Sequence, residues 1–210
     1  MRNNTNDVGL LHMIVGPMCA GKTTELLKKA NQESAIGRRV LLINHALDIR
    51  HDTAGLATHT SGNKTQTSHF KTISVNNLRE VLYSRSSTKH KTSIDLKEYD
   101  VICIDELQFF EDPCIVIDFF VNILNKIVYG AGLIADFKQE PFGDILPLLS
   151  MADSFEQCTG LCSVCNDGTV GCFTMRKKTN DEKKNTDVIS VGDCEKEYML
   201  VCRKHFKKPF

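Results

Sequence analysis

Residues 16–23, which read GPMCAGKT, constrain the fold of this chain more than any other segment. They fit the pattern G-x-x-x-x-G-K-[ST] at every fixed position. An apolar run precedes them, and residues 23–36 follow with leucines and alanine at helical spacing. In such a strand–loop–helix unit, backbone N–H groups wrap nucleotide phosphates, the lysine bridges phosphate oxygens and the hydroxyl ligates Mg²⁺. A chance match to the pattern would lack the preceding strand and the following helix. We therefore predict that nucleotide phosphates are held by Gly16, Pro17, Met18, Cys19, Ala20, Gly21, Lys22 and Thr23.

A site of this kind needs a second anchor for Mg²⁺, an acidic residue at the end of a neighbouring strand. The apolar residues 101–104 are followed directly by Asp105 and Glu106. Because successive residues at a strand end point in different directions, the two carboxylates can serve different purposes. We predict that Asp105 holds the metal and that Glu106 faces the phosphoryl acceptor as a base. The alternative is that both acids merely cap an exposed strand end.

Apolar runs alternate with helical patterns as far as residue 151, which is typical of an α/β fold with a parallel sheet flanked by helices. Strands are expected at residues 10–15, 40–43, 99–104 and 127–135. Helices are expected at residues 23–36, 76–83, 113–125 and 144–151. The polar residues 46–71 predict a long loop, and residues 84–93 predict an exposed insertion.

The charge balance and the lengths of the apolar runs argue against nucleic acid and membrane as partners. The chain carries 26 Lys+Arg and 26 Asp+Glu, whereas proteins that grip a nucleic-acid backbone usually have a basic excess. No apolar run approaches the roughly 18 residues of a membrane span. Residues 1–7 lack the basic-then-apolar pattern of a signal peptide. We therefore expect a cytoplasmic protein that acts on a small molecule.

The nine cysteines suggest a metal site near the end of the chain, because no export signal supports a disulfide framework. Cys162 and Cys165 form a C-x₂-C pair, and Cys202 and His205 form a C-x₂-H pair. Together they make a Cys₃His set, which predicts a closed, structural Zn²⁺ site. The alternative is a group of reduced cysteines with an incidental histidine. Since the sequence loses its periodicity here, we place a domain boundary near Phe155, giving domains at 8–154 and 155–206.

In chain order, these motifs resemble those of the type II thymidine kinases, the cytosolic, zinc-containing deoxynucleoside kinases of animals, bacteria and large DNA viruses. The similarity runs from about residue 11 to residue 206. It rests on the phosphate loop followed by TEL, and on segments similar to D-x-R, T-H, D-E-x-Q-F-F, P-F-G and F-T-x-R. These segments begin at Asp48, Thr58, Asp105, Pro141 and Phe173, and a further similar segment runs from Tyr198 to Arg203.

The resemblance implies a RecA-like P-loop domain followed by a small zinc-binding lasso domain. It also implies transfer of the γ-phosphate of ATP to the 5′-hydroxyl of thymidine, with deoxyuridine as a weaker substrate. Glu106 would accept the hydroxyl proton. The nucleotide and Mg²⁺ would be held by the phosphate loop together with Asp48, Arg50, Asp105 and Gln108. The nucleoside would be bound by Met18, Phe109, Leu133, Phe137, Phe142, Thr174 and Tyr198.

The resemblance further implies a homotetramer, feedback inhibition by dTTP and a loop at about residues 167–198 that folds over the nucleoside. This sequence departs from the family pattern at Cys19, Leu107 and residues 191–193. The sequence leaves two alternative functions open: a P-loop ATPase acting on nucleic acid with a zinc-ribbon module, and a nucleotide-binding regulatory subunit without turnover. The small size and zero net charge argue against the first of these.

Overall fold

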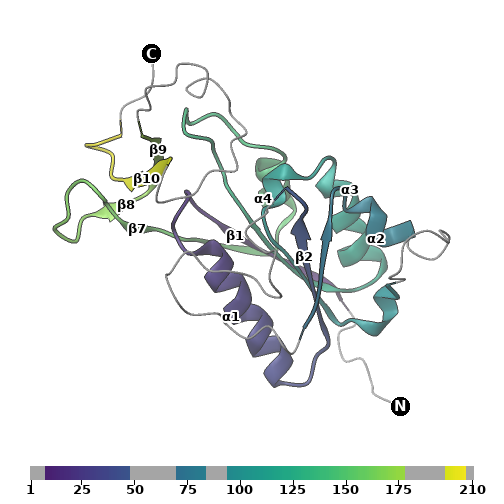
Figure 1. Ribbon diagram of the computed structural model, residues 1–210. Helices are drawn as coiled ribbons and strands as arrows, with labels where there is room; N and C mark the ends of the chain where they lie inside the picture. The colour runs from purple at the N-terminus through teal and green to yellow at the C-terminus, as the bar shows by residue number, and fades with distance from the viewer. Residues whose placement is uncertain (1–7, 48–69, 84–93, 178–196, 207–210) are drawn as a thin grey trace.

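The computed structural model describes residues 8–47, 70–83, 94–177 and 197–206 (Figure 1). Its centre is a six-stranded parallel sheet in the order β3-β2-β4-β5-β1-β6. The strands are β1 (Leu10–Val15), β2 (Val40–His45), β3 (Lys71–Val75), β4 (Val101–Ile104), β5 (Ile127–Gly132) and β6 (Ser154–Gln157). Four of the strands are rich in buried aliphatic side chains because helices or further chain cover both faces.

Helix α1 (Lys22–Ala35) covers one face of the sheet (Figure 1). Its buried residues Leu26, Leu27 and Ala30 recur at the spacing of one helix face, and they pack against Leu42 and Cys103 of the sheet. The burial of Cys103, which raises the pKa of its thiol, agrees with a small core residue.

The opposite face is covered by α2 (Arg79–Tyr83), α3 (Pro113–Asp118) and α4 (Ile145–Met151). Val116, Phe120 and Leu148 belong to the core on this side, where Ile43 and Ile104 of the central strands meet them. A π-helical turn, Phe119–Ile123, continues α3, and Leu124 N–H donates to the carbonyl of Phe119. The single α-helix expected at 113–125 is therefore a short α-helix followed by a wider turn.

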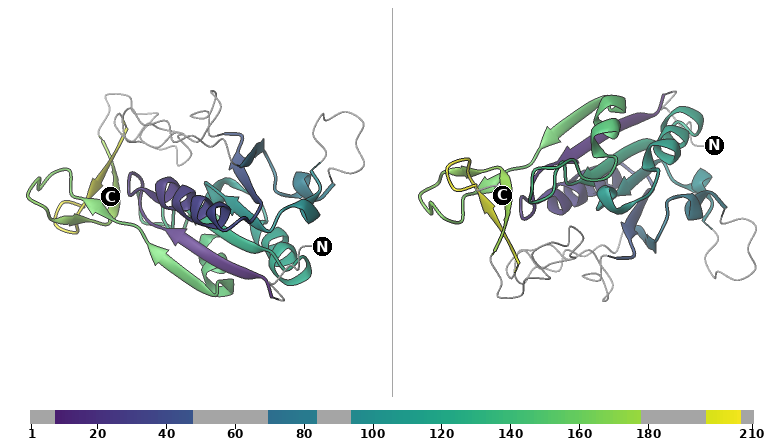
Figure 2. Two further views of the ribbon diagram at one scale, coloured as in Figure 1. Left: turned by 90° about the horizontal axis from the view of Figure 1, so that it is seen from below. Right: turned by 90° about the horizontal axis from the view of Figure 1, so that it is seen from above.

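The end of the described chain forms two small hairpins beside the sheet. Strands β7 (Gly160–Leu161) and β8 (Val170–Gly171) pair with each other, as do β9 (Phe173–Arg176) and β10 (Tyr198–Val201). Figures 1 and 2 show both hairpins gathered at one end of the molecule, next to the loop that joins β1 to α1. We call residues 158–177 and 197–206 the zinc module, after the Zn²⁺ site that the sequence predicts there.

The parallel α/β architecture and the strands near 10–15, 40–43, 99–104 and 127–135 are confirmed. Two strands of the six-stranded sheet were not expected, β3 and β6. In β3 only Ile73 and Val75 are apolar, so the alternation is too short to predict a strand. Strand β6 pairs with β1, so the sheet continues through Gln157, beyond the expected boundary at 154/155. Within the described residues, no helix has the length and apolar character needed to cross a membrane.

Candidate nucleotide site and metal centre

Two glycines shape the loop after β1, Gly16 through a close backbone contact and Gly21 through its conformation. Gly16 has φ 155°, and a Cβ at this position would lie 2.4 Å from the carbonyl oxygen of Cys158. Cys158 N–H in turn donates to the carbonyl of Val15 at 2.7 Å, which ties the end of β6 to the end of β1. Gly21 has φ 81°, a left-handed conformation that glycine adopts without strain, and it precedes the first turn of α1. The loop therefore has the tight path that a phosphate-wrapping motif requires.

Two residues of the first turn of α1 point into this loop region. Lys22 is buried, and its Nζ donates to the carbonyl of Pro17 at 2.8 Å. Thr23 Oγ1 donates to Asp105 Oδ2 at 2.8 Å, although the two residues are 82 positions apart. Asp105 Oδ1 also accepts from the backbone N–H of Glu106 at 2.9 Å. The structure thus brings together the hydroxyl and the carboxylate that the sequence predicted as the two Mg²⁺ anchors.

The donor set at this position fits Mg²⁺. One hydroxyl oxygen and one carboxylate oxygen lie side by side at the carboxyl end of the sheet, and hard oxygen ligands are those that Mg²⁺ prefers. With bound phosphates, Thr23 and Asp105 would complete a site of the kind found after P-loops.

Glu106 leaves β4 in a left-handed conformation, with φ 53° and ψ 43°. Its carboxylate accepts a hydrogen bond from Nε2 of Gln108. Gln108 is 4% exposed, and its Oε1 accepts from the backbone N–H of Leu133 at 3.0 Å. Because the backbone donor of Leu133 fixes which amide atom is oxygen, Nε2 must face Glu106. Gln108 therefore orients the carboxylate, a role that the sequence did not predict.

Gly143 supports the backbone of Gln108. It has φ 55°, and a Cβ would lie 2.5 Å from the carbonyl oxygen of Gln108. The P-F-G segment of the sequence is thus a place where two backbones touch, which explains its glycine in physical terms.

Four of the aromatic residues that the resemblance assigns to the nucleoside form two pairs. The rings of Phe109 and Phe142 meet edge-on, with centroids 5.7 Å apart and planes at 89°. Phe137 and Tyr198 form a second pair with centroids 6.4 Å apart, and the guanidinium of Arg176 lies over both of these rings. Among the nucleoside residues implied by the resemblance, Leu133, Phe137, Thr174 and Tyr198 are buried, and Met18, Phe109 and Phe142 are partly exposed.

Thr174 joins the zinc module to the phosphate loop. Its Oγ1 accepts from the backbone N–H of Met18 at 2.9 Å, across a sequence separation of 156 residues. Thr174 is buried on β9 opposite Leu200 of β10. The position of the β9–β10 hairpin is therefore linked directly to the conformation of the loop at residue 18.

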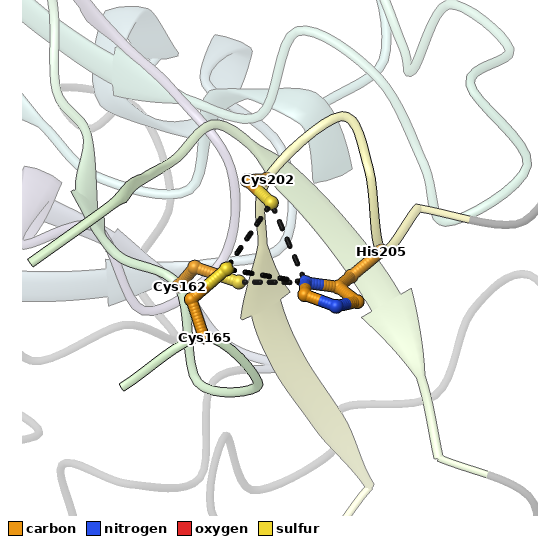
Figure 3. Close-up of side chains that lie close together, drawn as sticks. All are labelled: Cys162, Cys165, Cys202 and His205. Carbon is orange, nitrogen blue, oxygen red and sulfur yellow. Dashed lines mark hydrogen bonds between the residues drawn. The ribbon is translucent and has the colours of Figure 1, made fainter. Parts of the chain in front are cut away.

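Cys162, Cys165, Cys202 and His205 converge in the zinc module, with all four ligand atoms within 4.8 Å of one another (Figure 3). His205 Nδ1 lies 3.6, 3.3 and 3.5 Å from the Sγ atoms of the three cysteines in chain order, and the Sγ atoms of Cys165 and Cys202 are 3.7 Å apart. Tetrahedral zinc with ordinary bond lengths would hold sulfur atoms about 3.8 Å apart and sulfur and nitrogen about 3.6 Å apart. The cluster therefore fits Zn²⁺, as the sequence predicted.

The chemical state of Cys162 also suits a metal ligand. Burial raises the pKa of its thiol, but hydrogen bonds from the backbone amides of Cys165, Cys202 and Val164 outweigh burial and lower the pKa to about 5. A thiolate is the form of cysteine that binds metals. Cys158 and Cys172 lie outside this cluster.

Several expected features fall outside the described residues. These are Asp48, Arg50, Thr58, the insertion at 84–93, the departures at 191–193 and Cys194. Asn44 was not singled out in the sequence, although it is a polar residue that follows the apolar run of β2 and is buried. The sequence did contain a signal for this residue, because Asn44 is a polar residue near the end of an otherwise apolar strand.

Comparisons with known proteins bear on the family to which this chain belongs. Residues 9–206 match the family model described as thymidine kinase. The chain is 36% identical over 202 residues to a thymidine kinase of Oryza sativa, covering 94% of this chain and 66% of that protein, so it spans about two thirds of the rice enzyme. It is 31% identical over 205 residues to a thymidine kinase of Pyrobaculum aerophilum (95% and 100%) and 32% identical over 196 residues to that of Choristoneura fumiferana entomopoxvirus (92% and 94%).

Among solved structures, the flagellar accessory protein FlaH of Methanocaldococcus jannaschii superposes with a TM-score of 0.50 at 17% identity, covering 78% of this chain and 75% of that one. At this identity the likeness concerns the fold alone. With a family match over nearly the whole chain and relatives above 30% identity, the chain belongs to the thymidine kinase family.

Proposed function

We propose that this protein transfers the γ-phosphate of ATP to the 5′-hydroxyl of thymidine. The observation that carries the proposal is the arrangement of Lys22, Thr23 and Asp105 around a phosphate-wrapping loop, with Glu106 at the end of the same strand as Asp105. Family membership supplies the acceptor, because the relatives are thymidine kinases. A P-loop alone would not identify the molecule that accepts the phosphoryl group.

The residues of the site suit catalysis by positioning and charge neutralisation, which dominate phosphoryl transfer. The Lys22 ammonium, which donates to the Pro17 carbonyl at 2.8 Å, can turn to the phosphates when nucleotide binds. Mg²⁺ held by Thr23 and Asp105 would neutralise charge on the phosphate oxygens. Glu106, with its carboxylate fixed by Gln108, would accept the proton of the 5′-hydroxyl as the new bond forms.

The aromatic pairs and the zinc module suit recognition of a flat base. Phe109 and Phe142 offer an apolar wall, and Tyr198 lies on the strand that runs directly into the zinc ligand Cys202. Zinc would hold the two ends of the module together, since its core is small and is centred on Cys162, Val201 and Cys202. We also infer a cytoplasmic homotetramer with feedback inhibition by dTTP, on the grounds of the family resemblance.

Turnover of ATP in the presence of different acceptors tests this proposal. We expect ATP consumption to depend on thymidine, to continue more weakly with deoxyuridine, and to be near background with deoxyadenosine or deoxyguanosine. One methyl group in an apolar pocket is worth about 1–3 kcal/mol, so deoxyuridine should remain a real substrate. Stimulation by single-stranded DNA instead of thymidine would favour a nucleic-acid ATPase. Tight nucleotide binding without turnover would favour a regulatory subunit.

The hydrogen bonds of Gln108 should be needed for a fast reaction but not for ATP binding. Replacing it with leucine removes the donor to Glu106 and leaves the backbone N–H of Leu133 without its acceptor. We expect kcat to fall about 10- to 100-fold, because a misplaced base costs rate, while the KM for ATP changes little. Steady-state kinetics of Gln108→Leu against the control Gln157→Leu, an exposed position on β6, measure this. An unchanged kcat would contradict the positioning role.

A further inference from the structure

We infer that Asn44 is an additional residue of the metal and phosphate site, where its side-chain amide hydrogen-bonds the hydration shell of Mg²⁺ or a phosphate oxygen. The inference rests on the proposed function, since it takes Mg²⁺–nucleotide as the ligand of the loop. Asn44 is 1% exposed, and within the part of the chain that the structure describes neither its Nδ2 nor its Oδ1 has a hydrogen-bond partner. Buried side-chain amides almost always have partners, so both atoms call for an explanation.

The register of the sheet places Asn44 beside Asp105. Strands β2 and β4 are parallel, with Ile43 opposite Ile104, and Asp105 N–H donates to the carbonyl of Ile43 at 2.9 Å. Asn44 is therefore level with Asp105 on the adjacent strand, where neighbouring backbones lie about 4.8 Å apart.

The alternation of side chains places both residues on the same face. Leu42 and Cys103, two positions before Asn44 and Asp105, belong to the core on the α1 side of the sheet. Side chains two residues apart along a strand share a face, so Asn44 and Asp105 also face α1. Asp105 accepts from Thr23 at the first turn of α1, which shows that this face leads to the phosphate loop.

The side-chain amide of Asn44 has the right groups to bind a hydrated Mg²⁺ ion that lies between the nucleotide phosphates and the Asp105 carboxylate. Its Oδ1 can accept from a metal-bound water, and its Nδ2 can donate to a phosphate or carboxylate oxygen. Mg²⁺ keeps several of its waters when bound by proteins, so groups behind the direct ligands contribute to its affinity. On this account the two amide atoms are unpaired in the free protein and become paired when Mg²⁺–nucleotide binds.

The test compares Asn44→Leu, an apolar side chain with the same branching and the same number of heavy atoms, with the control Ser74→Ala on the neighbouring strand, which is exposed and opposite Asn44 in register. The first measurement is thermal unfolding of the ligand-free proteins. Because the described residues offer the amide no hydrogen bond to lose in that state, Asn44→Leu should unfold at the same temperature as the parent protein or a higher one. A clear loss of stability would overturn the inference, since it would mean that the amide is already paired.

The second measurement is equilibrium binding of ATP without thymidine, titrated with Mg²⁺ and repeated in excess chelator. We expect the Mg²⁺ concentration needed for half-maximal binding to rise about 10-fold or more in Asn44→Leu, as when other outer partners of metal ligands are removed. The affinity for ATP in excess chelator should differ less between Asn44→Leu and the parent protein. An unchanged Mg²⁺ midpoint in Asn44→Leu would overturn the inference. Because neither measurement uses thymidine, a failure of the proposed activity would appear separately, as absent turnover in the parent protein.

Discussion

Glu106→Gln should retain nucleotide binding and lose nearly all turnover with thymidine. The neutral amide can still accept the hydrogen bond from Gln108 Nε2, so the local structure should persist, but it is a far weaker proton acceptor. Removing a general base typically costs about 10²- to 10⁴-fold in rate, and we expect kcat to fall within that range. Single-turnover and steady-state kinetics with saturating ATP and thymidine measure it directly.

The matched control is Glu111→Gln, which neutralises an exposed carboxylate a few residues further along the same segment. It should have the kcat of the parent protein. Near-normal kcat in a folded Glu106→Gln protein would show that the proton of the 5′-hydroxyl leaves by another route. Asp105→Asn gives a useful contrast, because it should weaken Mg²⁺–nucleotide binding as well as rate, since Asp105 already accepts from Thr23.

Loss of zinc should abolish thymidine phosphorylation while leaving the sheet folded. The parallel strands have their own cores on both faces, whereas the core of the zinc module is centred on Cys162, Val201 and Cys202. The binding energy of a structural zinc is largely folding energy of the segment that it ties together. Without it, the β9–β10 hairpin should lose its order, and with it the hydrogen bond from Met18 to Thr174 and the position of Tyr198.

Elemental analysis of the purified protein should give one zinc per chain, and Cys202→Ser should reduce that content sharply. Hydrogen exchange should then increase in residues 158–177 and 197–206 and remain low in β1, β2, β4 and β5. Cys172→Ser is the matched control, because Cys172 lies in the same module but outside the ligand cluster, and it should retain both zinc and activity. A protein with no stoichiometric zinc and full activity would contradict this assignment.

Features of this protein that depend on short-range patterns could be predicted from the amino-acid sequence alone. The phosphate loop with its flanking strand and helix, the acidic pair after residue 104 and the two ligand pairs of the zinc module are all set by residues close together in the chain. Each follows from local geometry: glycines permit a tight turn, an apolar run forms a buried strand, and a two-residue gap places two ligands on one turn. The family match confirmed the function class that these motifs indicated.

Which of these parts contact one another became known from the three-dimensional fold. Met18 and Thr174 are 156 residues apart, and Leu133 and Gln108 are 25 apart, yet each pair shares a hydrogen bond. The order of the strands places β4 beside β2, and this order, not any motif, brings Asn44 level with Asp105. Sheet order and register depend on the packing of whole faces over long sequence separations, so no local pattern encodes them. The phosphate loop could therefore be identified from the sequence. The residues that orient Glu106 and surround Asp105 were identified only from the fold.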